Sequence, residues 1–185
     1  MSSDDSRRRV VLVVGGVRSG KSRYAQERAK RGERVAVIAT AEARDEDMRH
    51  RIERHRRERP SSWTTVEAPV ALPQAIADCG QRFDTILIDC LTLWASNLLE
   101  HEAEQPDRVQ GHVDRLCHAL ARASASVIVV SNEVGSGIVP DNELGRTYRD
   151  LLGGINQRVA AVADEVILLV AGCPMVIKQA LETTA

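Results

Sequence analysis

The sequence predicts an α/β fold, in which a mostly parallel β-sheet carries helices on both faces and an antiparallel strand at one edge. Short apolar, β-branched runs alternate with amphipathic segments along the chain, which is the pattern of βαβ units. The run at residues 10–14 is apolar at every position, as expected of a strand buried on both faces. The last two runs are joined by only four residues, 171–174, a length that suits a hairpin.

The same patterns place each element. Strands are expected at residues 10–14, 34–40, 63–67, 83–89, 126–131, 165–170 and 175–178, and helices at 22–30, 44–59, 70–80, 92–100, 109–124 and 144–163. Gly80 is predicted to lie just past the end of its helix. The Gly153–Gly154 pair is predicted to interrupt the last helix, because glycine lowers helix stability.

Length and composition narrow the class of protein. A chain of 185 residues suits one domain, which we place at residues 10–185 after a disordered polar tail at residues 1–9. The net charge of −1 and the aromatic content of 3% argue against a nucleic-acid-binding surface. No apolar run approaches the length of a membrane span, and the four cysteines lie far apart. We therefore expect reduced thiols, a cytoplasmic location and no membrane or nucleic-acid partner.

The segment between the first strand and the first helix carries the strongest motif. Gly15, Gly20, Lys21 and Ser22 match the phosphate-binding loop G-x-x-x-x-G-K-[ST]. Its backbone N–H groups and the start of the following helix bind phosphate oxygens. Lys21 would reach the β- and γ-phosphates, and the Ser22 hydroxyl would bind Mg²⁺. The sequence therefore predicts a nucleoside-triphosphate site on a three-layer, RecA-like P-loop NTPase fold.

Other polar residues are expected at the same edge of the sheet, because ligands gather at the carboxyl ends of parallel strands. Thr40 and Ala41 follow one strand, Asp89 ends another, and Asn132–Glu133 follow a third. We assign Asp89 to Mg²⁺, with a helix N-cap as the alternative. Glu133 would position a water or a hydroxyl, or else belong to a plain turn.

The charged helix at residues 44–59 has a narrow apolar stripe. Met48, Ile52 and His55 share one side at helical spacing, whereas His50 points away. Arginines suited to phosphate contacts follow His55. A neutral imidazole can attack phosphorus to form a phosphoramidate. The alternative is a structural histidine on a solvated charged face.

These motifs together resemble one family. Residues 15–23 (G-G-V-R-S-G-K-S-R), the R-I-x-x-H-x-x-x-R-P helix at residues 51–60 and N-E-V-G-x-G-I-V-P at residues 132–140 look like the bifunctional adenosylcobinamide kinase / adenosylcobinamide-phosphate guanylyltransferases. The similarity spans nearly the whole chain, from Val10 to Lys178. It implies cobalamin biosynthesis, with ATP or GTP and Mg²⁺ for phosphorylation of adenosylcobinamide. GMP from GTP then passes through a histidine to adenosylcobinamide-phosphate.

The resemblance also implies the site residues and the assembly. The guanylylated histidine would be His55, and Lys21 would be the other catalytic residue. Relatives form homotrimers. Some of them carry a second histidine where Arg54 stands, and others carry glutamate at Asp89. The implied nucleotide-binding residues are Gly15, Gly16, Val17, Arg18, Ser19, Gly20, Lys21, Ser22, Ala39, Thr40, Ala41, Arg56, Arg57, Glu58, Arg59, Glu67 and Asp89, with Ser22 and Asp89 as metal ligands.

Two other functions fit the P-loop. A simple small-molecule kinase would use the loop alone and leave His55 structural. A nucleotide-dependent switch is disfavoured because the chain has no N-K-x-D guanine-reading segment. A RecA-like motor is disfavoured because neither the net charge of −1 nor the aromatic content of 3% supports a nucleic-acid groove.

Overall fold

The computed structural model describes residues 8–102 and 105–179. In this part of the chain, seven strands form one sheet in the order β3-β2-β4-β5-β1-β6-β7. All neighbouring strands are parallel except the β6–β7 pair at one edge, so the predicted mixed sheet is confirmed. The strands are β1 (Val10–Gly15), β2 (Val35–Ala39), β3 (Thr64–Glu67), β4 (Thr85–Ile88), β5 (Ser126–Val130), β6 (Glu165–Val170) and β7 (Cys173–Lys178).

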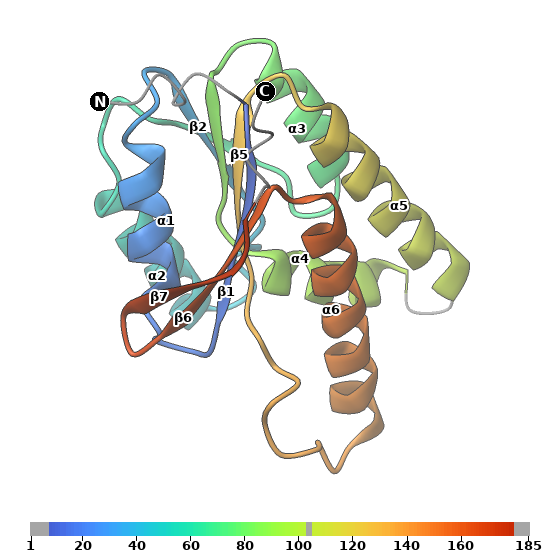
Figure 1. Cartoon of the computed structure of the whole chain (residues 1–185). Helices are drawn as coiled ribbons and strands as arrows, with labels where there is room; N and C mark the ends of the chain where they lie inside the picture. Colours follow the sequence, from blue (N-terminus) through green and yellow to red (C-terminus); the bar gives the residue numbers. More distant parts are fainter. Residues whose placement is uncertain (1–7, 103–104, 180–185) are drawn as a thin grey trace.

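The helices cover both faces of this sheet, which gives three layers (Figure 1). Helix α1 lies on one face and α3, α4, α5 and α6 lie on the other, while α2 follows β2 at the carboxyl edge of the strands. The helices are α1 (Lys21–Ala29), α2 (Glu46–Arg57), α3 (Leu72–Gly80), α4 (Leu91–His101), α5 (Pro106–Arg122) and α6 (Glu143–Val162). None of the helices described is long and apolar enough to cross a membrane.

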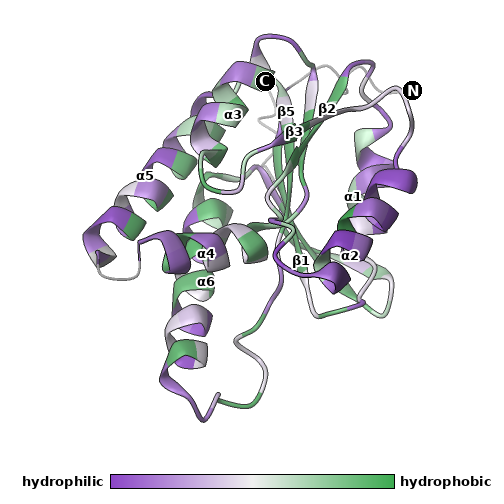
Figure 2. Cartoon of the chain, turned by 180° about the vertical axis from the view of Figure 1, so that it is seen from behind, coloured by the Kyte–Doolittle hydropathy of each residue, from purple (hydrophilic) through white to green (hydrophobic). Residues whose placement is uncertain are grey.

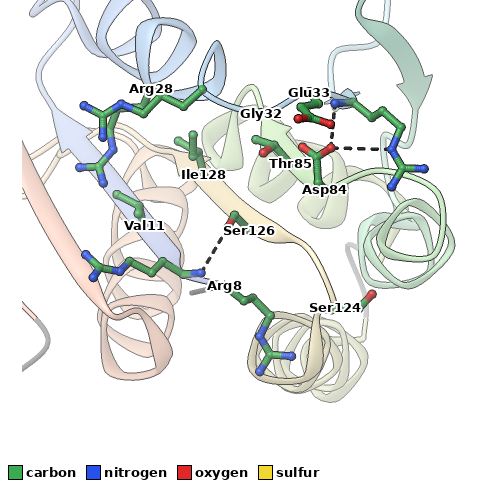
Figure 3. A pocket seen from close by; sticks show the side chains of 13 residues that line it. Arg8, Val11, Arg28, Gly32, Glu33, Asp84, Thr85, Ser124, Ser126 and Ile128 are labelled. Atoms are coloured by element: carbon green, nitrogen blue, oxygen red, sulfur yellow. Dashed lines mark hydrogen bonds and ion pairs between the residues drawn. The ribbon is translucent and has the colours of Figure 1, made fainter. Parts of the chain in front are cut away.

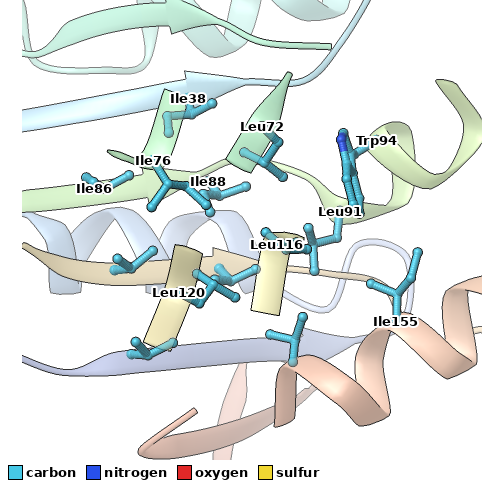
Figure 4. Packing of buried hydrophobic residues seen from close by; sticks show 14 of the residues in the cluster. Ile38, Leu72, Ile76, Ile86, Ile88, Leu91, Trp94, Leu116, Leu120 and Ile155 are labelled. Atoms are coloured by element: carbon cyan, nitrogen blue, oxygen red, sulfur yellow. The ribbon is translucent and has the colours of Figure 1, made fainter. Parts of the chain in front are cut away.

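Successive side chains of a buried strand point to opposite faces of the sheet, so the hydrophobic core consists of two clusters, one on each face. Val11 and Val13 pack on the α1 side, whereas Val10 and Leu12 face the opposite helices. The larger cluster joins β2 and β4 to the inner faces of four helices, and the fully buried Trp94 lies at its α4 end (Figure 4). Apolar colour accordingly concentrates on the strands, and hydrophilic colour lies on the outer sides of the helices (Figure 2). This packing fixes the sheet edge on which the site is built.

Two predicted glycine roles are wrong. Helix α6 runs without interruption through Gly153 and Gly154, because Leu152, Ile155 and Val159 anchor it in the core. Gly80 lies inside α3 rather than past its end. A Cβ atom there would lie 2.8 Å from Ser124 Oγ, so this glycine permits close approach of the loop after α5.

Two boundaries also differ from prediction. The β6–β7 turn has two residues, Ala171 and Gly172, both at positive φ (51° and 83°), as in the tight turns that match strand twist. Our predicted tail includes Arg8 and Arg9, but Arg8 donates to the Ala121 carbonyl and Arg9 pairs with Glu165. The rest of that tail, residues 1–7, lies outside the described residues.

Candidate nucleotide site at the carboxyl edge of the sheet

The phosphate-binding loop joins β1 to α1 in a conformation that needs two of its glycines. Gly15 has φ +152°, and a Cβ there would lie 2.4 Å from the Leu169 carbonyl oxygen. Gly20 has φ +97° and sits against the β6–β7 turn, with 3.3 Å between its Cβ position and Gly172 Cα. The Gly172 N–H donates to the Ser19 carbonyl at 2.9 Å. The turn therefore supports the loop from the far edge of the sheet.

Lys21 opens α1 and lies inside the curl of the loop. Its side chain is nearly buried, and Nζ donates to the Gly16 carbonyl at 2.6 Å. Burial lowers the pKa of Lys21, and the nearby Cys90 opposes that shift only in part. A desolvated ammonium beside the N-terminus of a helix binds phosphate oxygens strongly, because little water competes there.

Asp89 lies at the end of β4, and both of its carboxylate oxygens have partners. Oδ1 accepts from the Thr40 N–H at 3.1 Å and from the Thr40 hydroxyl at 3.3 Å. Oδ2 accepts from Arg59 Nη2 at 2.9 Å. The Arg59 side chain is only 7% exposed, and its Nε is buried without a partner. The structure thus brings Thr40, Arg59 and Asp89 together as predicted, and shows an ion pair that the sequence did not reveal.

Helix α2 carries His55 towards this edge. Met48, Ile52 and His55 are half-buried and His50 is exposed, so the predicted stripe is confirmed. The His55 side chain is 43% exposed, and its Nδ1 lies 3.5 Å from Glu58 Oε2. Arg56 pairs with Glu67 at the end of β3. None of the α2 side chains that the structure describes is fully buried. Arg56 within α2 and Arg59 just past its end link this helix to Glu67 and Asp89 at the ends of β3 and β4.

Asn97 organises the loop between β2 and α2 and was missed from the sequence. It is buried in α4, and its amide nitrogen donates to the carbonyls of Thr40 (2.8 Å) and Pro69 (2.9 Å). Its oxygen accepts from Arg44 at 2.9 Å. A single amide therefore holds three segments that converge on the site. The available signal was a single amide within residues 91–99, which otherwise are apolar or carry a hydroxyl.

Glu133 makes the turn that we gave as its alternative role. Its two oxygens accept from the N–H groups of Gly135 (2.7 Å) and Ser136 (3.2 Å). Burial acts to raise the pKa of Glu133, but these hydrogen bonds outweigh it and leave the pKa below its usual value. The Glu133 N–H donates to the Gly15 carbonyl at 3.1 Å. The loop after β5 is thus tied to the phosphate-binding loop.

Oxygen donors suited to Mg²⁺ are present at this edge. Ser22 is exposed beside Lys21, and Asp89 supplies a carboxylate. Hydroxyl and carboxylate oxygens are the ligands that Mg²⁺ takes together with nucleotide phosphates. No group of three or more histidine, cysteine or acidic side chains that would hold a metal ion occurs in the described ranges. Ser22 and Asp89 are therefore donors of the kind that Mg²⁺ takes when it is bound together with a nucleotide.

Two hollows lie away from this edge. One, of about 540 Å³, is at the amino ends of the strands and is lined by five arginines among other residues (Figure 3). Arg9 and Arg28 there pair with Glu165, and Arg34 faces Asp84. The other, of about 950 Å³, lies between α3 and α5. Neither has a glycine-rich loop at the start of a helix, so the phosphate site remains at the carboxyl edge.

The fold and this loop define a P-loop nucleotide-binding protein. Solved structures with the same fold include an ATPase of a type III secretion system (TM-score 0.55, 13% identity, 88% of this chain and 51% of that one). Another is EscN of enteropathogenic E. coli (TM-score 0.54, 12% identity, 89% and 43%). The chain thus spans about half the length of these proteins or less, and the likeness concerns the fold alone.

The family follows from closer matches. Residues 11–177 match the family described as cobinamide kinase / cobinamide phosphate guanyltransferase, and the chain belongs to this family. It is 42% identical to the bifunctional adenosylcobalamin biosynthesis protein CobP of Pseudomonas aeruginosa, over 90% of this chain and 96% of that protein. It is 41% identical to the protein CobU of Salmonella typhimurium, over 91% and 99%. The predicted family is confirmed.

Proposed function

We propose that this protein is a bifunctional enzyme of cobalamin biosynthesis. It phosphorylates adenosylcobinamide with a nucleoside triphosphate, and it then transfers GMP from GTP through His55 to give adenosylcobinamide-GDP. The observation that carries the proposal is the attachment of α2, which bears His55, to the phosphate site through the Arg59–Asp89 ion pair. A nucleophile on this helix and a phosphate-binding loop then serve one bound nucleotide.

In the phosphorylation step, the loop holds the triphosphate. Backbone N–H groups of residues 15–20 and the start of α1 bind its oxygens, and Lys21 moves from the Gly16 carbonyl to the β- and γ-phosphates. Ser22 and Asp89 would hold Mg²⁺, which neutralises charge on the phosphates when it is bound. The acceptor hydroxyl attacks the γ-phosphorus, its proton passes to solvent, and the nucleoside diphosphate leaves.

In the transfer step, a ring nitrogen of His55 attacks the α-phosphorus of GTP. A P–N bond forms and pyrophosphate leaves. The carboxylate of Glu58, 3.5 Å from Nδ1, stabilises the positive charge that the ring acquires. An oxygen of the adenosylcobinamide-phosphate then attacks the same phosphorus, the P–N bond breaks, and His55 is regenerated.

The remaining assignments complete the proposal. The nucleotide would contact the phosphate-binding loop (residues 15–22), residues 39–41 and 56–59, Glu67 and Asp89. We also propose a homotrimer, on the basis of the family resemblance, and a cytoplasmic location, on the basis of the widely spaced cysteines.

The proposal is tested by product analysis with adenosylcobinamide, ATP, GTP and Mg²⁺. Wild type should give adenosylcobinamide-GDP. His55→Ala should stop at the phosphorylated intermediate, whereas Lys21→Ala should lose phosphorylation. If His55→Ala still forms adenosylcobinamide-GDP, transfer through His55 is wrong. If wild type forms only the phosphate, the protein is a simple kinase.

A further inference from the structure

The hollow at the amino ends of the strands has the size of a binding site for a small molecule. Its volume is about 540 Å³, and sites for small molecules measure about 300–1,000 Å³. Val11 and Ile128, which are buried, lie between Arg28 and Arg8 (Figure 3). Both belong to the core cluster on the α1 side. The hollow therefore lies on that face of the sheet, at the edge opposite the phosphate-binding loop.

Positive charge exceeds negative charge around this hollow. Among the described residues that line it, five are arginines and two, Glu33 and Asp84, are acidic. A third carboxylate, Glu165, pairs with two of the arginines, Arg9 and Arg28. Five guanidinium groups thus stand against three carboxylates. Such an excess of one sign in a concave surface favours a ligand of the opposite charge.

Arg8 and Arg31 supply cations that lack a carboxylate partner within residues 8–102 and 105–179. Both side chains are exposed, so a ligand can reach them from solvent. Arg8 donates to the Ala121 carbonyl at 3.4 Å, which leaves its charge uncompensated because a carbonyl is neutral. The Arg31 side chain has neither a hydrogen bond nor an ion pair with the described residues. These two arginines are therefore available to an anion.

Arg34 lines the same hollow from the loop between α1 and β2. Its side chain is 69% exposed, and its Nε lies 3.7 Å from Asp84 Oδ2. The same oxygen accepts from the Arg34 backbone N–H at 2.8 Å, so the carboxylate keeps a donor when the guanidinium moves. An exposed, loose ion pair of this kind contributes little energy. Arg34 can therefore turn towards an anion at small cost.

We propose that this hollow binds a small polyanion that carries a di- or triphosphate group. A guanidinium binds two phosphate oxygens through parallel N–H groups. A chain of two or three phosphates offers such oxygens to Arg8, Arg31 and Arg34 together, whereas a single phosphate engages fewer of them. Strand β1 has six residues and thus separates the two edges by roughly 20 Å. The ligand is therefore distinct from the nucleotide at the phosphate-binding loop, and the inference does not depend on the proposed function.

The test measures binding of inorganic tripolyphosphate by titration calorimetry at low salt without Mg²⁺. Lys21→Ala is the background, because it weakens the phosphate-binding loop and leaves the amino edge unchanged. This variant should still bind tripolyphosphate, and addition of Arg8→Gln and Arg31→Gln should lower the affinity about 10-fold. Addition of Arg108→Gln and Arg115→Gln, two exposed arginines of α5, removes the same charge and should have little effect. Absence of binding in Lys21→Ala, or equal affinities after the two double changes, would overturn the inference.

Further titrants identify what the hollow recognises, each compared with and without the Arg8→Gln and Arg31→Gln changes. Orthophosphate should bind at least about 10-fold more weakly than tripolyphosphate, because it engages fewer guanidinium groups. Equal binding of the two would contradict a di- or triphosphate ligand. Pyrophosphate or GTP that shows the same dependence on the two arginines would support the proposal. Tighter binding of GTP than of tripolyphosphate would identify a nucleotide as the source of the phosphates.

A second readout needs no change at the hollow. In Lys21→Ala, tripolyphosphate should shift the amide NMR signals of residues 31–34, which line the hollow between α1 and β2. The shifts should fall as salt is added, because salt screens exposed charges. Shifts confined to residues 15–22 would place the anion at the phosphate-binding loop and overturn the inference.

Discussion

The Arg59–Asp89 ion pair should be the main attachment of α2 to the sheet, and Arg59→Met tests this. The substitution keeps the apolar stem of the side chain and deletes its charge. Removing one partner of a buried pair costs about 3–5 kcal/mol. Arg59 is 7% exposed and Asp89 is 25% exposed. Because Asp89 keeps two bonds from Thr40 and some contact with water, we expect a smaller loss, of about 2 kcal/mol.

For a chain of this size, that loss corresponds to a fall of about 4–8 °C in melting temperature. Scanning calorimetry of Arg59→Met, Asp89→Asn and the double variant measures the coupling between the two residues. Arg57→Met is the control, because Arg57 is exposed and its side chain donates, among the residues that the structure describes, only to the Glu53 carbonyl of the same helix. Hydrogen exchange of the α2 amides should accelerate in Arg59→Met and stay unchanged in the control. Equal stability of the two variants, or strictly additive effects in the cycle, would refute the attachment.

Three further predictions concern other parts of the structure. Gly154→Ala should raise the free energy of unfolding in urea by about 1 kcal/mol, because α6 is continuous at this position and its Cβ position is open. A lower free energy of unfolding would mean that the helix is interrupted there. Asn97→Leu should lower the free energy of unfolding by about 2–4 kcal/mol, because the Thr40 and Pro69 carbonyls lose their donor. It should also weaken nucleotide binding in titration calorimetry. Unchanged affinity would show that Asn97 does not support the nucleotide site. Burial raises the pKa of Glu165, but Arg28 and Arg9 outweigh it and leave the pKa lowered. Its contribution to stability is therefore complete above the unfolded pKa of about 4.5 and is lost as pH falls through the folded value. Glu165→Gln should remove that part of the acid dependence in urea unfolding between pH 7 and 3, and an unchanged profile would contradict it.

The strands were predictable because burial on both faces demands unbroken apolar runs, as in Val10–Val14. The phosphate-binding loop was predictable because its glycines are required by positive φ and close approach. The roles of Gly80 and Gly153–Gly154 were not, because local propensity cannot reveal the packing partners that decide them.

Contacts within the site were harder to predict than its location. Arg59 and Asp89 are 30 residues apart, and they meet only because β3, β2 and β4 are neighbours in the sheet. Asn97 belongs to no short motif. Its significance lies in the carbonyls of Thr40 and Pro69, which need a hydrogen-bond donor. Hydrogen-bonding requirements of this kind can be identified only from the folded structure.

The measurement that tests the central claim most directly is intact-protein mass spectrometry after incubation with GTP and Mg²⁺. Wild type should gain the mass of one GMP in an acid-labile adduct. His55→Ala should gain none, and His50→Ala, which changes an exposed histidine of the same helix, should behave as wild type. An adduct that persists in His55→Ala, or none in wild type with GTP bound, would contradict the assignment of His55 as the nucleophile.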